Sequence, residues 1–174
     1  GWSPQEIEFT FESPASGDLY MLQTRDMAIR ESSRELCFDP EAFPPGALLG
    51  RGIGVSGGGM SGRVVFSLED IAHWRVREPT TRLILARTDT VPDDIREIHA
   101  ADGLVTARGG VTSHAAVVAH RLGKTCVVGC TELVCDEREG ACTFAGVVLR
   151  TGDRISIDGR GGAVFRGEIT VLPG

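Results

Sequence analysis

The 174-residue sequence lacks any apolar run close to the roughly 20 residues that a membrane-spanning helix needs. It also lacks an excess of basic residues, since 18 Lys and Arg stand against 24 Asp and Glu, for a formal net charge of −6. Nucleic-acid binding usually requires a basic face, so we expect neither nucleic acid nor membrane as a partner. The first residues, GWSPQEIEFT, do not combine a basic start with an apolar core, so we expect no signal peptide and a cytoplasmic location.

Cysteine is scarce and irregularly spaced. The sequence has five cysteines, an odd number, and no CxxC pair. Cys126, Cys130 and Cys135 are separated by three and four residues, with no histidine close behind. We therefore expect reduced thiols and no metal site, with Cys126 and Cys130 serving as small buried side chains. Apolar residues make up 41% of the chain, enough for a core that needs neither disulfides nor metal.

The chain divides into three predicted parts. Residues 1–25 read as a β-hairpin, because EIEFTF alternates charged and apolar residues, SPASGD supplies a turn and LYMLQTR resumes an apolar run. A lone hairpin is marginally stable in water, so this one should rest on another surface. Residues 26–49 read as a helix over DMAIRESSRELCF and a proline-rich linker, which places a boundary between Phe38 and Gly50.

Residues 50–174 have the pattern of a compact α/β domain. From Arg82 to Gly129 the order is strand, helix, strand, helix, strand: RLILAR, VPDDIREIHAA, GLVTA, SHAAVVAHRL and TCVVG. This order gives parallel strands with helices on a sheet face. Further short strands are expected at RVVF, GVVLR, RISID and AVFRG, with a brief helix around LEDIAHW and a flexible VSGGGMSG loop. The fold class is therefore α/β, with a mixed sheet that closes on itself around a βαβαβ core.

The stretch GGVTSHAAVVA, residues 109–119, carries the main candidate site. Thr112 or Ser113 is a natural N-cap, which places His114 in the first turn of a helix, where free N–H groups and the helix dipole favour an anion. Gly109 and Gly110 allow an incoming group to come close to the backbone. The helix end also disfavours the imidazolium, leaving a ring nitrogen free to attack. The combination predicts a histidine that accepts a phosphoryl group.

Two plainer interpretations stay open at this point. A histidine near a helix start is often a hydrogen-bonded structural residue, and a glycine-rich loop before a helix can bind free phosphate without catalysis. His73, His99 and His120 are expected to be structural. His120 lies six residues after His114, on a different helix face, so the two are not expected to share a metal.

The wider segment GLVTARGGVTSHAAVVAHRLGKTCVVGC closely resembles the phosphohistidine signature of the phosphoenolpyruvate-utilising enzymes. Within that group it most resembles the pyruvate, phosphate dikinases, whose pattern is G-G-x-[TS]-S-H-A-A-[VI]-[VI]-A-R, then G-K and a strand ending in G-C. His120 stands where the family usually has arginine, and Arg121 follows it. ILARTDTVPDDIREIHAADG and RTGDRISIDGRGGAVFRGEI extend the resemblance on both sides.

The resemblance implies a swivelling carrier domain of a phosphotransferase. In the family, ATP pyrophosphorylates the histidine, phosphate removes the terminal phosphoryl group, and the domain swings to a TIM barrel where pyruvate becomes phosphoenolpyruvate. His114 would be the nucleophile and carrier, and Arg108 would help to neutralise charge. The phosphoryl pocket would be shaped by Gly109, Gly110, Thr112 and Ser113.

The first residues, QEIEFTFESPASGDLYMLQTRD, resemble the end of the ATP-grasp nucleotide domain that precedes the carrier in dikinases. The resemblance implies metal–nucleotide ligands at Glu6 and Glu8, with Glu6 in place of the usual aspartate, and a nucleotide-binding pair at Gln23 and Arg25. Mg²⁺ and ATP would be cofactors of the parent enzyme, with neither expected on this chain. Its partners would be the ATP-grasp and TIM-barrel domains, without which the chain cannot complete the reaction.

Two alternatives remain beside the dikinase carrier. One is the carrier of a sister enzyme, such as phosphoenolpyruvate synthase, the phosphotransferase-system enzyme I, or an antibiotic or glucan dikinase. The synthase usually has cysteine before its histidine, so Ser113 favours the dikinase. The other is a non-catalytic docking module that keeps the fold, against which the intact His114 loop argues.

Overall fold

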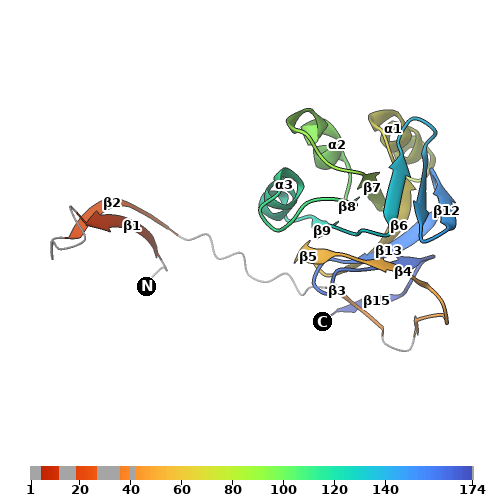
Figure 1. Ribbon diagram of the computed structural model, residues 1–174, viewed down its shortest axis with the longest axis horizontal. Coiled ribbons are helices and arrows are strands. Elements are labelled where there is room, and N and C mark those ends of the chain that lie inside the picture. The colour runs from red at the N-terminus through yellow and green to blue at the C-terminus, as the bar shows by residue number, and fades with distance from the viewer. Residues whose placement is uncertain (1–4, 12–18, 27–35, 40–41, 174) are drawn as a thin grey trace. The chain divides into compact units, whose positions relative to one another are not determined.

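The computed structural model describes residues 5–11, 19–26, 36–39 and 42–173. By their contacts these residues form two separate units, Gly1–Ser33 and Arg34–Gly174 (Figure 1). No helix in the described part of the chain is both long enough and apolar enough to cross a membrane.

The first unit is the predicted hairpin. Strand β1 (Gln5–Phe11) pairs antiparallel with β2 (Leu19–Asp26), and a register shift falls between Glu8 and Phe9. The four consecutive residues 19–22 are each about half exposed or more, although three of them are large and aliphatic and the fourth is Tyr20. The sequence-based expectation that this hairpin rests on another surface stays a prediction.

The second unit is built on an eight-stranded mixed sheet in the order β4-β14-β13-β6-β7-β8-β9-β5. Its four middle strands β6 to β9 are parallel, and the others pair antiparallel. The strands are β4 (Leu48–Arg51), β5 (Ile53–Ser56), β6 (Gly59–Val65), β7 (Leu83–Arg87), β8 (Gly103–Thr106), β9 (Thr125–Val128), β13 (Arg154–Asp158) and β14 (Ala163–Arg166).

The sheet curls so that its two edges meet. The edge strands β4 and β5 follow each other in the chain with only Gly52 between them, so the two sheet edges must lie close together. A Cβ on Gly52 would come within 2.4 Å of the Val128 carbonyl oxygen, which shows how tightly the backbones approach there. The mixed sheet, its closure and the βαβαβ core are confirmed.

Each parallel connection passes through a helix, and Figure 1 shows the three helices together on one side of the sheet. They are α1 (Leu68–Arg77), α2 (Ile95–Ala100) after a short 3₁₀ turn (Pro92–Asp94), and α3 (His114–Leu122). Strand β7 is buried throughout because it has packing on both faces: Leu83 and Leu85 belong to the helix-side core, whereas Ile84 and Ala86 belong to a second core.

The second core lies under a three-stranded antiparallel sheet. Its strands are β10 (Leu133–Asp136), β11 (Ala141–Phe144) and β12 (Val147–Arg150). Phe66 and Phe144 are among the largest fully buried side chains in this core. All three strands are four residues long, and only β12 was expected from the sequence, because β10 and β11 flank the charged run DERE.

The predicted helix over residues 26–38 is wrong at both ends, and its first residue, Asp26, is the last residue of β2. Residues 36–38 form strand β3 (Leu36–Phe38), which pairs with β15 (Val171–Pro173), and the part over residues 27–35 lies outside the described residues. A Cβ on Gly58 would lie 2.1 Å from the Leu36 carbonyl oxygen, so β3 packs directly on the main sheet. This tertiary pairing overrides the loose helical spacing, and it assigns Leu36–Phe38 to the larger unit.

Of two other expectations, one needs correction and one is confirmed. The VSGGGMSG segment is not a flexible loop: it forms the end of β5, a turn at Gly57 with φ +74°, and the start of β6. A Cβ on Gly62 would lie 2.4 Å from the Arg82 carbonyl oxygen, so the glycines permit close strand packing. The cysteines behave as expected, since all five are reduced and both Cys126 and Cys130 are buried.

Candidate functional site

The candidate site lies at the carboxyl edge of the parallel strands. The turn after β7 (residues 88–91) and the loop after β8 (residues 107–113) run side by side there. The amide of Ala107 donates to the Arg87 carbonyl oxygen at 3.1 Å, and the amide of Arg108 donates to the Thr88 carbonyl oxygen at 2.9 Å. This edge is where α/β sheets commonly bind ligands.

The loop before His114 is held by short backbone contacts. The buried hydroxyl of Thr106 donates to the Arg108 carbonyl oxygen at 2.6 Å, and the amide of Ser113 donates to the Gly110 carbonyl oxygen at 2.9 Å. Gly109 has φ +103°, and a Cβ there would stand 3.0 Å from both Cβ and Oγ of Ser113. A Cβ on Gly110 would meet nothing within 4 Å. Gly109 is therefore required by the fold, whereas Gly110 leaves open space.

Helix α3 begins at His114 itself. Ser113 is the N-cap, with φ −65° and ψ 158°, and its Oγ accepts a hydrogen bond from the Ala116 amide at 3.3 Å. Of the two predicted caps, the structure selects Ser113, while Thr112 is exposed. The remaining amides of the first turn have no partner within the helix, which makes this end suited to an anion.

His114 carries an unpaired nitrogen. Its Nε2 is buried, and it has no hydrogen-bond partner among the described residues. Buried polar atoms are rarely left without a partner, so a purely structural role does not explain this one. On the neighbouring turn, the buried Oγ1 of Thr90 is likewise without a partner in the described part of the chain. An imidazole nitrogen whose lone pair is not engaged is what a nucleophilic histidine needs.

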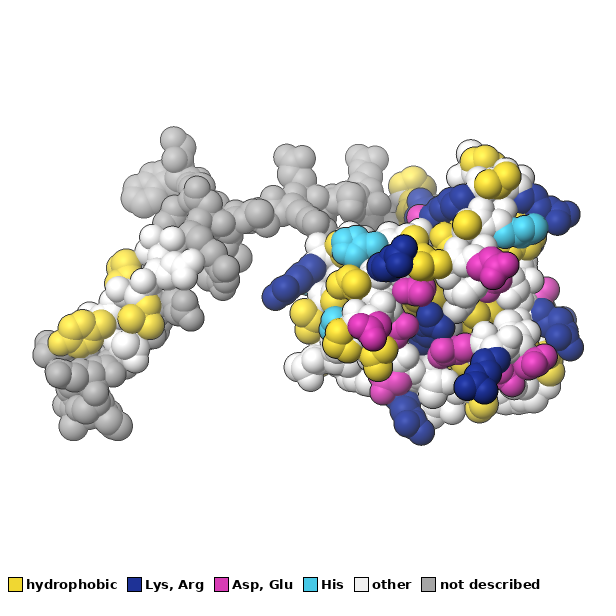
Figure 2. Space-filling view, turned by 90° about the horizontal axis from the view of Figure 1, so that it is seen from above, with side chains coloured by type: hydrophobic (Ala, Val, Ile, Leu, Met, Phe, Trp, Pro, Cys, Tyr) yellow, Lys and Arg dark blue, Asp and Glu magenta, His cyan; other side chains and the backbone are white. Residues whose placement is uncertain are grey.

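The other predicted residues fall into two groups. Arg108 is exposed on the same loop as His114, so it is available to an incoming anion. His73, His99 and His120 are all exposed, away from the helix start. Figure 2 shows a face of the larger unit on which acidic, basic and apolar side chains are interspersed.

The proposed nucleotide-binding residues belong to the other unit. The β1–β2 ladder places Glu6 directly opposite Arg25 and Glu8 directly opposite Gln23. The two pairs are separated by one pair of residues along the ladder, so all four positions are close together. Gln23 is exposed. Their role in nucleotide binding stays a prediction.

Sequence reasoning missed a buried arginine at this edge. The Arg87 guanidinium, with a side chain 9% exposed, pairs with Glu137 at 2.9 Å and lies 3.4 Å from Asp94 and 3.9 Å from Glu97. The arginine at the end of the apolar run RLILAR was the one sign in the sequence of a buried charge at this place. Its partner Glu137 lies fifty residues further on, which no local pattern could have shown.

One lysine joins two helices at the end of α3 opposite to His114. Lys124 follows the left-handed C-cap of α3, Gly123 with φ 65°, and its Nζ donates to the carbonyl oxygens of His99 and Ala101 at the end of α2. Burial lowers the pKa of Lys124. The carbonyl contacts fix the end of α3 against α2, and so hold the helix that carries His114.

Comparison with known proteins identifies the class. Residues 79–162 match the family model of the "PEP-utilising enzyme, mobile domain", a segment that includes the loop and helix described above. The chain belongs to this family.

Within the family the chain is similar to pyruvate, phosphate dikinases. The enzyme of Rhizobium meliloti is 39% identical over 197 residues, covering 97% of this chain and 21% of the relative. The enzyme of Clostridium symbiosum is 34% identical over 198 residues, covering 95% of this chain and 22% of the relative. The chloroplastic pyruvate, phosphate dikinase 1 of Arabidopsis thaliana is 40% identical over 135 residues, covering 78% and 14%. The chain thus corresponds to one part of these enzymes, about a fifth of their length or less.

Proposed function

We propose that this chain is a phosphoryl carrier, with His114 as the residue that accepts and hands on the phosphoryl group. The observation that carries the proposal is the buried Nε2 of His114, which lacks a hydrogen-bond partner among the described residues at the start of α3. Membership of the mobile-domain family supports it, because this loop and helix lie inside the matched segment.

The chemistry needs only groups that stand at this edge. The Nε2 lone pair attacks phosphorus, an N–P bond forms, and the P–O bond to the donor's leaving group breaks. Amides of the first turn of α3 would stabilise the phosphoryl oxygens, and the exposed Arg108 would offset their charge. Gly110 leaves the backbone open where the group would arrive. Transfer to the acceptor reverses these steps and frees the histidine.

For the parent enzyme we propose the dikinase reaction, in which ATP and phosphate charge the histidine and pyruvate is the acceptor. The partners would be an ATP-grasp domain and a barrel that binds phosphoenolpyruvate and pyruvate. Mg²⁺ and ATP would serve as cofactors of this parent enzyme. We propose the cytoplasm as the location, with a chloroplast as the alternative that the Arabidopsis thaliana relative suggests.

The test is transfer from phosphoenolpyruvate. The chain is mixed with Mg²⁺, phosphoenolpyruvate and the dikinase of Clostridium symbiosum whose own carrier histidine has been replaced. We expect pyruvate release together with an acid-labile phosphoryl group on this chain. The His114→Ala variant should take up none, whereas His120→Ala, which changes an exposed histidine on the same helix, should behave like wild type. Equal uptake by His114→Ala would contradict the proposal.

A further inference from the structure

Arg87 is the most buried charged side chain near the candidate site, and two separate segments supply its three partners. It is the last residue of β7, at the carboxyl edge of the sheet. Asp94 and Glu97 come from the start of the α2 region, and Glu137 comes from the turn between β10 and β11. An arginine buried to this degree is costly unless it is paired, so these carboxylates hold it in place.

The same carboxylates hold the turn that follows Arg87. The second oxygen of Glu137 accepts a hydrogen bond from the Thr88 amide at 3.4 Å. The second oxygen of Asp94 accepts one from the Val91 amide at 2.8 Å. Both ends of the 88–91 turn are therefore fixed through groups that also contact Arg87.

The 88–91 turn also holds the loop that leads to His114. The carbonyl oxygens of Arg87 and Thr88 accept hydrogen bonds from the amides of Ala107 and Arg108. Gly109 follows directly, and its backbone packs against the cap Ser113. A displacement of the 88–91 turn would pass through these contacts to the first turn of α3.

The region also keeps buried polar atoms unpaired. Within the described residues, Nε of Arg87, Oε2 of Glu97 and Oγ1 of Thr90 have no hydrogen-bond partner, as is also the case for Nε2 of His114. Arg87 therefore uses its two terminal nitrogens for ion pairs, while its Nε has no partner among the described residues.

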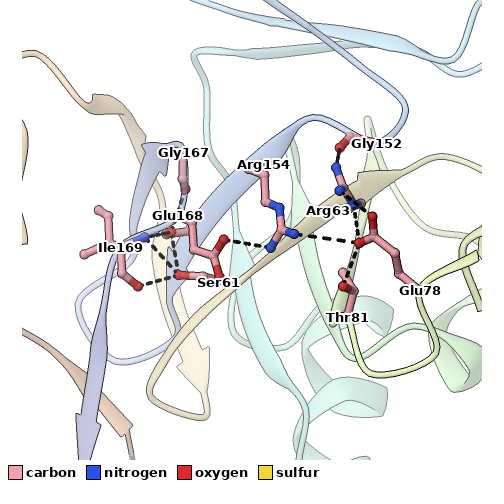
Figure 3. A network of polar contacts seen from close by, with 10 residues as sticks. Ser61, Arg63, Glu78, Thr81, Gly152, Arg154, Gly167, Glu168 and Ile169 are labelled. Atoms are coloured by element: carbon pink, nitrogen blue, oxygen red, sulfur yellow. Dashed lines mark hydrogen bonds and ion pairs between the residues drawn. The ribbon is translucent and has the colours of Figure 1, made fainter.

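A second arginine–glutamate pair shows that contrast. Arg63 forms a bidentate pair with Glu78, at 2.9 Å and 2.7 Å, and its remaining nitrogen donates to the Gly152 carbonyl oxygen at 2.6 Å (Figure 3). Arg154 and Thr81 add contacts to the same glutamate. Arg63 lies level with Leu83, the first residue of β7, so it stands at the opposite edge of the sheet from Arg87.

We propose that Arg87, held by Glu137, is a positioning residue for His114, which makes the β10–β11 turn part of the phosphoryl-transfer machinery. This inference rests on the proposed function, in which His114 accepts the phosphoryl group. Arg87 acts through the 88–91 turn and the 107–113 loop, and it sets where the imidazole stands relative to the free amides of α3.

The experiment compares Arg87→Lys and Glu137→Gln with Arg63→Lys in the 174-residue chain. Lysine keeps the charge but cannot reproduce the forked contacts of Arg87. Glutamine keeps an acceptor for the Thr88 amide but loses the ion pair, and Glu137 is exposed enough (39%) that the variant should fold. Arg63→Lys weakens a comparable pair far from the loop and serves as the control.

Two readouts are taken on each variant. The first is the rate at which phosphoramidate, a small-molecule donor, phosphorylates His114. The second is the pH titration of the His114 ring by ¹⁵N NMR, which needs no phosphorylation. We expect both Arg87→Lys and Glu137→Gln to shift the ring signals and to slow labelling by about tenfold or more, since small displacements of reacting groups have effects of this order. Arg63→Lys should leave both readouts at wild-type values.

The outcomes separate the two proposals. Wild-type ring signals and rates in both Arg87→Lys and Glu137→Gln would overturn the positioning role. The same shift in Arg63→Lys would also overturn it, because the effect would then reflect general destabilisation. Failure of the wild-type chain to accept a phosphoryl group would overturn the proposed function, and the ring titrations would then decide the positioning of His114 alone.

Discussion

Replacing Gly109 by alanine should destabilise the larger unit, while the same change at the adjacent Gly110 should not. Gly109 has φ +103°, a backbone conformation that residues with a side chain rarely adopt. The added Cβ would also stand 3.0 Å from Cβ and Oγ of Ser113, the N-cap of α3. Backbone strain of this kind costs about 1–3 kcal/mol, and a weakened cap adds up to about 1 kcal/mol. The expected total is about 1–4 kcal/mol.

Gly110 is the matched control. It lies outside the left-handed region, and a Cβ there meets nothing within 4 Å. Alanine should therefore leave the free energy of unfolding unchanged or raise it by about 0.4–1 kcal/mol, because it restricts the unfolded chain. Because Gly110 lies on the loop that leads to His114, under the proposed function a methyl group there would narrow the open space available to an arriving phosphoryl group. We expect Gly110→Ala to be labelled more slowly while it stays fully stable.

Thermal unfolding followed by circular dichroism compares the two variants. The midpoint of Gly109→Ala should fall by roughly 3–12 °C relative to wild type, and that of Gly110→Ala should not fall. Equal stability of the two variants would refute the argument, because it would mean that neither the φ angle nor the Ser113 contact constrains the loop.

Three further predictions follow from the rest of the larger unit. Gly123→Ala should lower the free energy of unfolding by about 1 kcal/mol in urea titrations, because Gly123 ends α3 with φ 65°, and an unchanged midpoint would contradict this role. Hydrogen bonds from Arg63, and then Thr81, hold the pKa of Glu78 at about 2 instead of 4.5, so the stability it contributes is complete above about pH 5 and is lost as the pH falls toward 2. In urea titrations between pH 6 and 2, the free energy of unfolding of Arg63→Met should fall less with decreasing pH than that of the wild type. An equal fall in both proteins would count against the Arg63–Glu78 pair. Iodoacetamide should alkylate the exposed Cys37 first in the folded chain, because burial raises the pKa of the other four thiols to about 12. Peptide masses recorded over time identify the alkylated cysteine. Early labelling of the other four thiols would show that they are not protected.

Local patterns predicted the part of the fold that is local. The βαβαβ core follows from apolar runs such as RLILAR and from end signals such as Pro92 and Gly123, which the structure places at the start of the 3₁₀ turn and at the C-cap of α3. Strand β3 could not be predicted in the same way, because Leu36–Phe38 becomes a strand only by pairing with β15, more than a hundred residues later. The same holds for β10 and β11, whose short strands gain their stability from the core beneath them.

The candidate site shows the same division. His114 and its cap at Ser113 could be predicted, because the capping signal and the glycines lie within six residues of each other. Arg87 could not, because its meaning depends on Glu137, which only the fold brings near. The sequence could not tell which of the two successive glycines is indispensable. Only the structure shows that Gly109 has a positive φ and that Gly110 does not.

The measurement that most directly tests the central claim is chemical phosphorylation of the chain, mapped to one residue. The chain is treated with phosphoramidate, and intact mass and peptide mapping are recorded under conditions that preserve acid-labile phosphohistidine, with His114→Ala and His120→Ala in parallel. We predict one phosphoryl group on His114 in the wild type and in His120→Ala, and none at that peptide in His114→Ala. A folded wild-type chain that carries no phosphoryl group on His114, or carries it on another histidine, would contradict the assignment of His114 as the phosphoryl acceptor.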